Sequence, residues 1–127
     1  MNNGSSSLLH ATNTGTGATT YTGGGLNLPV SVAIDGAGQV WIANTSNTLS
    51  VFANDGSNVS PGSGYQAATA HQASALNLPS SIAIDGSGSV WITDKANGTV
   101  TKVFGAAVPV VAPTSTAVTN NTVGTKP

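Results

Sequence analysis

The sequence predicts an all-β protein made of small antiparallel sheets, because it repeats itself, favours strands and is rich in turn residues. Residues 26–44 and 76–94 are identical at thirteen of nineteen positions at an offset of fifty. The identities include Leu, Pro, Ile, Asp and Trp, so they are not only matches between the small residues that dominate the chain. Repetition at a spacing of this size indicates an architecture of repeated supersecondary units.

Each copy of the repeat has the pattern of a hairpin followed by a further strand. β-Branched residues follow a proline, which can start a strand but rarely lies inside one. An Asp-Gly-x-Gly turn follows, where glycine tolerates positive φ and the carboxylate accepts backbone N–H groups. The turn residues are Asp35, Gly36 and Gly38 in the first copy and Asp85, Gly86 and Gly88 in the second. The predicted strands are 30–35, 40–42 and 48–52 in the first copy and 80–85, 90–92 and 99–104 in the second.

Alternation along these strands gives both sheet faces apolar side chains. Val32 and Ile34 lie on one face, and Ala33 and Trp41 lie on the other. An isolated antiparallel sheet would have one polar face, so the pattern favours small sheets that stack face to face, as the blades of a β-propeller do. Trp41 and the equivalent Trp91 are interpreted as packing between blades, with stacking on a sugar as the alternative.

The predicted fold is two four-stranded antiparallel blades plus the outer strand of a preceding blade. Residues 1–25 are assigned to that outer strand, within 5–21, and its link, and residues 26–75 to a first blade with a fourth strand around 65–70. Residues 76–105 are assigned to a second blade of three strands. Residues 106–127, rich in Pro, Val and Thr, are predicted to be an extended and partly disordered tail.

The composition restricts the chemistry of the chain. Only 6% of the residues are charged, and the net charge of −1 argues against nucleic-acid binding and against adhesion to anionic membranes. The chain has no cysteine, and its two histidines, His10 and His71, lie outside the repeat core. A metal site needs three or four ligands, so no metal site is predicted. No cofactor and no catalytic residue are predicted either, and both histidines are interpreted as structural.

Residues 29–52 resemble an NHL repeat, and the second copy matches through Phe104. The pattern is a proline, then Val32-Ala33-Ile34-Asp35, a glycine turn, Val40-Trp41-Ile42, and an Asn before a strand that ends in Phe52. Similar repeats occur in streptogramin lyase-like propellers. The resemblance implies a propeller but no particular activity, and the Arg that is common in the third strand of the family is replaced here by Leu49.

One end of the predicted blades is the candidate binding surface. In a four-stranded meander, the loop between the second and third strands and the link to the next blade emerge together. The polar residues expected there are Asn27, Asn44, Asn47, Asn77, Asp94, Lys95 and Asn97. Their amide groups suit hydrogen bonds to a peptide or a glycan, and they suit plain solvation equally well.

Three functions are compatible with the sequence. The first is a non-catalytic propeller segment for binding or scaffolding, from the carboxyl-terminal part of a larger propeller. The second is a fragment of a propeller lyase or lactonase whose catalytic residues lie upstream, and the third is a low-charge structural surface protein. The expected partners are missing blades from a longer chain or identical copies in a ring. The sequence does not fix the compartment, and an extracytoplasmic or secreted location is weakly favoured for the full-length protein.

Overall fold

The computed structural model describes residues 4–11, 13–66 and 76–110, and within these ranges every regular element is a β-strand. The strands form antiparallel sheets only, as the sequence predicts. Across the described ranges there is no helix of the length and apolarity needed to cross a membrane.

The two repeats form two sheets of the same construction. The first contains β3 (Pro29–Ile34), β4 (Val40–Asn44) and β5 (Thr48–Phe52), and the second contains β6 (Pro79–Ile84), β7 (Val90–Asp94) and β8 (Thr99–Val103). Ala33 pairs with Trp41, as Ala83 pairs with Trp91. The register also shifts at the same place in both copies, just after the proline that starts the sheet. The predicted equivalence of the two tryptophans is therefore confirmed.

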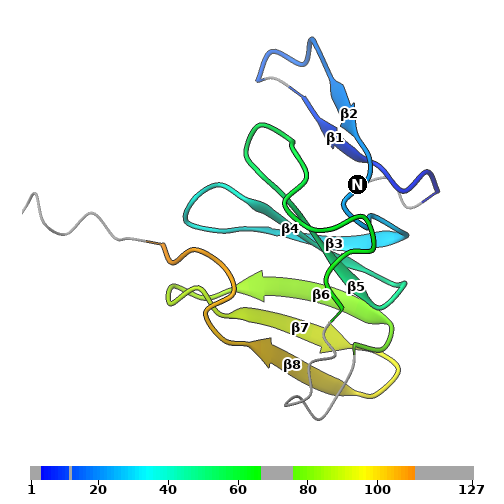
Figure 1. Ribbon diagram of the computed structural model, residues 1–127, viewed down its shortest axis with the longest axis vertical. Helices are drawn as coiled ribbons and strands as arrows, with labels where there is room; N and C mark the ends of the chain where they lie inside the picture. Colours follow the sequence, from blue (N-terminus) through cyan, green and yellow to red (C-terminus); the bar gives the residue numbers. More distant parts are fainter. Residues whose placement is uncertain (1–3, 12, 67–75, 111–127) are drawn as a thin grey trace, which may run out of the picture.

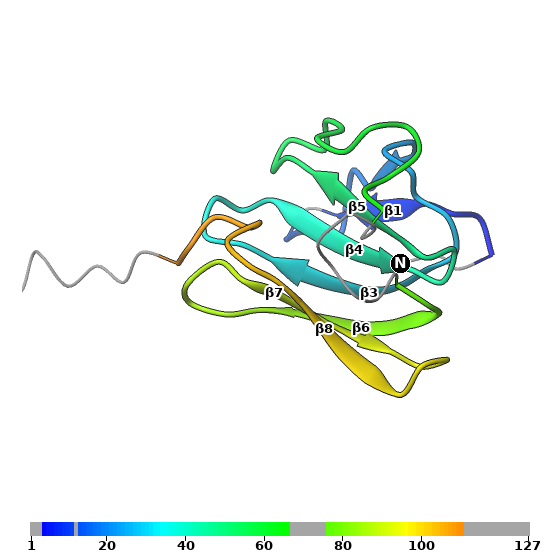
Figure 2. The same cartoon turned by 60° about the horizontal axis from the view of Figure 1, so that its bottom comes forward.

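The two sheets lie one against the other, and their facing sides form the larger hydrophobic core (Figures 1 and 2). The first sheet contributes the face that carries Trp41. The second sheet contributes the face that carries Ile82, which is the side away from Trp91. These residues are Trp41, Ala43, Leu49 and Val51 from the first sheet and Ile82, Val90 and Ile92 from the second. Face-to-face stacking of blades, predicted from the alternation, is what the structure contains.

Beyond β5, the first sheet is extended by a short segment and not by a regular fourth strand. Isolated bridges join Leu49 to Tyr65 and Phe52 to Asn58. Much of the fourth strand predicted around 65–70 lies outside the described residues. The second sheet has the three predicted strands, but its third strand ends at Val103, and the Phe104 side chain is 77% exposed.

The segment 1–25 differs from the single outer strand that the sequence predicts. Its described residues contain two short strands, β1 (Leu8–His10) and β2 (Thr19–Tyr21), paired with each other as a hairpin. Gly15 and Gly17, both with positive φ, lie in the connection and allow the chain to reverse there. The hairpin packs on the outer side of the first sheet, where Leu8 and Tyr21 cover a second hydrophobic cluster of Leu26, Ile42 and Phe52.

The segment after β8 turns back across both sheets, so its first residues have a specific place. Ala107 is buried, and its N–H donates to the Gly88 carbonyl at 3.0 Å. Next to it, Gly36 N–H donates to the Val108 carbonyl at 2.9 Å. We call residues 106–110 the strap. The remainder of the predicted tail, residues 111–127, lies outside the described part of the chain.

Candidate functional site

The Asp-Gly-x-Gly turns form one end of each blade, the turn end. The Asp35 carboxylate accepts four hydrogen bonds, from the N–H groups of Ala37, Gln39 and Val108 and from the Trp41 indole, at 2.9–3.2 Å. Burial alone would raise the pKa of Asp35, but these four donors outweigh burial and lower the pKa below its ordinary value. Asp35 therefore caps its turn, and it also ties the strap to the first blade.

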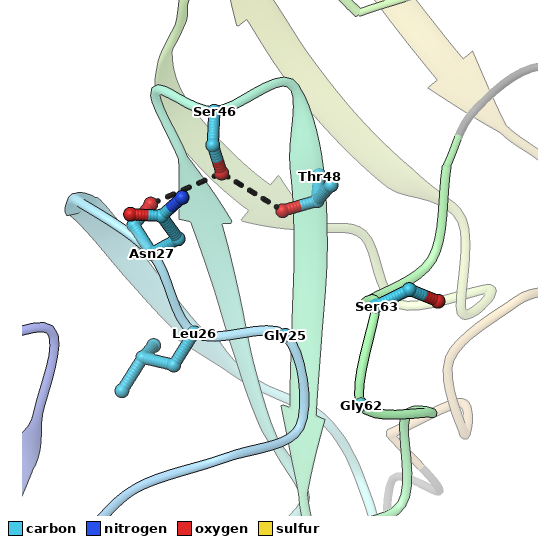
Figure 3. Close-up of a pocket in the computed structure, with 7 residues that line it drawn as sticks. All are labelled: Gly25, Leu26, Asn27, Ser46, Thr48, Gly62 and Ser63. Carbon is cyan, nitrogen blue, oxygen red and sulfur yellow. Dashed lines mark hydrogen bonds between the residues drawn. The ribbon is translucent and has the colours of Figure 1, made fainter.

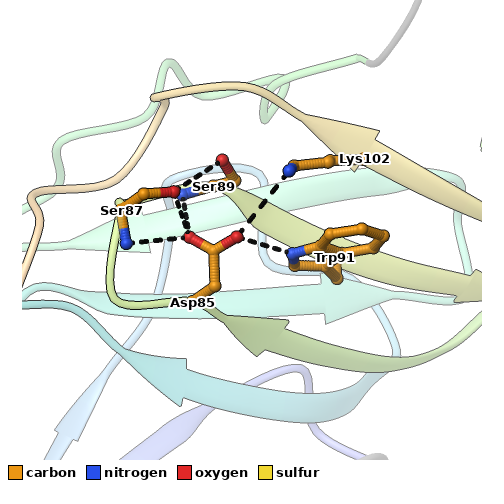
Figure 4. Close-up of polar contacts among 5 residues, drawn as sticks. All are labelled: Asp85, Ser87, Ser89, Trp91 and Lys102. Atoms are coloured by element: carbon orange, nitrogen blue, oxygen red, sulfur yellow. Dashed lines mark hydrogen bonds and ion pairs between the residues drawn. The ribbon is translucent and has the colours of Figure 1, made fainter.

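Asp85 makes the equivalent turn in the second blade, but its carboxylate accepts no hydrogen bond from the strap (Figure 4). Its carboxylate accepts hydrogen bonds from the hydroxyl and N–H of Ser87, from Ser89 N–H and from the Trp91 indole, at 2.6–3.0 Å. These bonds, those of the Ser87 and Trp91 side chains foremost, hold the pKa of Asp85 far below its ordinary value. The Asp35 carboxylate accepts a bond from Val108 in the strap. At the equivalent position of the second blade, Lys102 Nζ lies 3.8 Å from the Asp85 carboxylate.

Sequence reasoning missed the hydrogen bond between each Asp and the Trp six residues later. The bond is 3.2 Å for Asp35–Trp41 and 2.9 Å for Asp85–Trp91. The conserved spacing within the repeat was the available signal, since a tryptophan N–H that is buried against a sheet needs an acceptor. Hydrogen bonds within the fold occupy both carboxylates. Among the described residues, neither lies in a group of acidic side chains that could hold a metal ion.

A matched pair of glycine substitutions tests the contact between strap and turn. A Cβ on Gly36 would collide with the Pro109 carbonyl, whereas a Cβ on Gly86 would meet no atom within 4 Å. Neither glycine has positive φ. We expect Gly36→Ala to lower the free energy of unfolding by about 1–3 kcal/mol and Gly86→Ala to change it by about 0.5 kcal/mol or less. Urea unfolding measures both, and equal losses would contradict the strap contact.

Two of the candidate binding residues are buried at the opposite end, the loop end. Asn44 is 0% exposed, and its Nδ2 donates to Ser50 Oγ and to both oxygens of Thr48 at 3.0–3.3 Å. Asp94 is 1% exposed and accepts from Thr101 Oγ1 at 2.7 Å. Each also accepts a backbone N–H from the segment that leads into its own blade, that of Asn27 for Asn44 and that of Asn77 for Asp94, at 3.2 Å. Asn44 and Asp94 therefore hold the loop end together and do not form its surface.

The other candidates lie at the surface of the loop end. Asn27, Asn47, Lys95 and Asn97 are exposed and Asn77 is half-buried. Asn77 Nδ2 donates to Asn97 Oδ1 at 3.0 Å, and Asn47 Oδ1 accepts Leu78 N–H at 2.8 Å. Asn47 thus bridges the two blades, and Asn27 keeps a side-chain amide with no hydrogen bond to another described residue.

Leu28 and Leu78 are additional features of the loop end that sequence reasoning did not single out. Their φ angles are 52° and 50°, in the left-handed region that branched side chains rarely adopt. Both side chains are nearly half exposed, at 45% and 46%. Because the same strain recurs in both repeats, it belongs to the repeat itself, and it gives each blade one apolar side chain beside the amides.

A pocket of about 410 Å³ opens at the loop end of the first blade (Figure 3). Ser46 Oγ donates to the Asn27 carbonyl at 3.1 Å and shares a hydrogen bond with Thr48 Oγ1 at 3.2 Å. The pocket has no ionisable side chain in its wall, which consists of Gly25, Leu26, Asn27, Ser46, Thr48, Gly62 and Ser63. Its chemistry is that of neutral hydrogen bonding.

The structure describes one of the two histidines. His10 is exposed on β1, where it borders a hollow beside the first sheet, and His71 lies outside the described residues. Within residues 4–11, 13–66 and 76–110, no three His, Cys, Asp or Glu side chains are grouped as metal ligands.

Comparison with known proteins supports the architecture. A scan of protein-family models found no match, and a search of curated proteins found none either. Among solved structures, the chain is similar to one described as "Streptogramin B lyase structure", with a TM-score of 0.61 and 18% sequence identity. The match covers 91% of this chain and 37% of that chain. At this identity the likeness shows the fold, which is that of β-propeller blades, and the NHL resemblance stays a prediction from the motif.

Proposed function

We propose that this chain is a non-catalytic segment of a larger, NHL-like β-propeller and that its loop end binds a neutral, extended peptide. The observation that carries the proposal is the pocket beside Asn27, because neutral groups form its wall and an unbonded amide lies at its edge. Amides and hydroxyls do not titrate near neutral pH, so this wall can hold a ligand but cannot supply an acid–base pair.

A peptide suits the pocket better than a glycan does. Sugars in protein sites commonly lie against an aromatic ring, and the pocket wall contains none. The exposed Leu28 beside the amides offers an apolar contact for a peptide side chain, while Asn27 can both donate to and accept from a peptide backbone.

The place in a larger propeller rests on the number of blades. Propellers contain about four to eight blades, and the described residues form two three-stranded sheets besides the two-stranded β1–β2 sheet. The chain spans 37% of the propeller it resembles, so further blades supplied by a longer chain are compatible with the match. The lyase alternative draws no support from the fold alone, and it requires catalytic residues from outside the chain.

The binding proposal can be tested with an array of uncharged hexapeptides alongside an array of neutral oligosaccharides. We expect the chain to bind peptides, and Ser63→Arg, which fills the pocket, to weaken binding at least about tenfold. Ala37→Arg places the same charge at the turn end of the same blade and should bind as the wild type does. Binding to oligosaccharides alone, binding to neither array, or equal losses in the two variants would overturn the proposal.

A further inference from the structure

The two outward sheet faces repeat the two faces that pack inside the molecule. The face carrying Trp41 packs on the face carrying Ile82 and Ile92. By the repeat, Trp91 is the outward equivalent of Trp41, and Val32 is the outward equivalent of Ile82. We propose that the Trp91 face of one molecule docks on the Val32 face of a second copy, head to tail. The Trp91 face consists of Ala83, Trp91, Thr93, Val100 and Lys102, and the Val32 face consists of Val32, Ile34, Val40 and Ile42.

Each face carries exposed apolar side chains, although Ile42 in the Val32 face is fully buried. Trp91 is 40% exposed where Trp41 is 6% exposed, and Val32 and Ile34 are 43% and 64% exposed. Complementary surfaces at opposite ends of one molecule produce a heterologous contact, which continues from copy to copy or closes into a ring.

Hydrogen bonds across the internal contact identify a second copy as the occupant. Leu78 N–H donates to Asn47 Oδ1 at 2.8 Å, and Ile82 N–H donates to Ser31 Oγ at 3.2 Å. At the offset of fifty, the outward equivalents of these residues are the donors Leu28 and Val32 at one end and the acceptors Asn97 and Ser81 at the other. The loop that carries Asn97 is one residue longer than the loop that carries Asn47, and Asn97 Oδ1 accepts from Asn77 Nδ2 within its own blade. A second copy therefore supplies the apolar face together with the Ser81 acceptor.

The N-terminal segment already occupies part of the position that the second copy would take. Leu28 N–H donates to Ser6 Oγ at 3.3 Å, where the internal contact has the amide of Asn47. The β1–β2 hairpin covers one part of the Val32 face and leaves a hollow of about 310 Å³, bordered by Leu8, Tyr21, Val32, Ile34 and Val40 among others. The hairpin has only three residues in each strand, and the packing of Leu8 and Tyr21 on the first sheet holds it in place. The incoming blade displaces it.

The Trp91 face is more polar than the Trp41 face, which makes the contact reversible. Ser80, Thr93 and Lys102 replace Val30, Ala43 and Val51, as the pairing of the strands shows. Ser80 and Thr93 share a hydrogen bond of 2.9 Å, and Lys102 Nζ lies 4.5 Å from the centre of the Trp91 ring. These polar groups allow water to hydrate the Trp91 face in a single molecule. Lys102 must move aside when a second copy docks.

Sedimentation equilibrium of the full chain over a range of concentrations tests the proposal. We expect the mass to rise above that of the monomer with concentration. Ile34→Asp, at an exposed position of the Val32 face, should weaken association at least about tenfold, because docking would bury its charge. Val59→Asp is the matched control: Val59 is also exposed, and it follows β5 outside both hydrophobic clusters.

Two further measurements separate this contact from unspecific adhesion. In Trp41→Phe, the emission of the remaining Trp91 should shift to shorter wavelength as the mass rises. Tyr21→Ala removes a hairpin anchor and should strengthen association into discrete species. A wild type and a Tyr21→Ala variant that both stay monomeric would overturn the proposal. Equal losses in Ile34→Asp and Val59→Asp, or association with unchanged Trp91 emission, would also overturn it.

Discussion

Trp41→Ala is expected to lower the free energy of unfolding by about 3–5 kcal/mol, because it leaves a cavity at the contact between the two sheets. Trp41 is 6% exposed and belongs to the larger hydrophobic core. Trp91→Ala, at the equivalent position, should cost about 1 kcal/mol, since its ring is 40% exposed in the single molecule.

Urea unfolding followed by circular dichroism measures both variants, at a protein concentration low enough to keep the chain monomeric. The repeat makes each tryptophan the control for the other, because the two share a strand position and a bond to an aspartate. Equal losses would mean that the two sheets do not pack through the Trp41 face in solution.

Asp35→Ala is expected to lower the free energy of unfolding by about 2–4 kcal/mol at pH 7, because it takes a buried carboxylate away from the several donors that it accepts from. One of those donors is Val108 N–H in the strap and another is the Trp41 indole. Asp85→Ala should have a smaller effect, because Asp85 is more exposed than Asp35 and its carboxylate accepts no hydrogen bond from the strap.

The same carboxylate makes stability depend on pH. The pKa of Asp35 is lower in the folded chain than its ordinary value of 3.8, so the unfolded chain binds the proton more readily. The contribution of Asp35 is therefore complete above about pH 5 and is lost as the pH falls below 3.8 through the lowered folded pKa. Asp35→Ala should lose this part of the acid dependence in urea titrations between pH 7 and pH 2, whereas a Val59→Ala control should keep it. An unchanged pH profile in Asp35→Ala would contradict the assignment.

The candidate site was only partly predictable. The sequence places Asn44 and Asn47 in one short loop, and both carry the same amide. The structure buries Asn44 among hydroxyls of β5 and directs Asn47 to the next blade. The pleat of the sheet and the cover that the next blade provides decide which of the two amides faces water. The residue type fixes neither of these two factors.

The sequence by itself determined the unit of this protein. The Asp-Gly-x-Gly turn, the strand after each proline and the apolar alternation all act over fewer than about ten residues, so local chemistry suffices to specify two equivalent sheets. The repetition of Trp41 as Trp91 also follows from local sequence, as does the capping by Asp35 and Asp85.

Only the tertiary structure decided which copies of these residues are buried. Trp41 and Trp91 have the same neighbours in sequence, yet one lies between two sheets and the other faces solvent. Likewise, a segment read as one outer strand pairs with itself as the β1–β2 hairpin, and the strap returns to Asp35 across 73 residues. Burial and pairing at such separations depend on which surfaces are left uncovered after the sheets stack, and no local pattern records that.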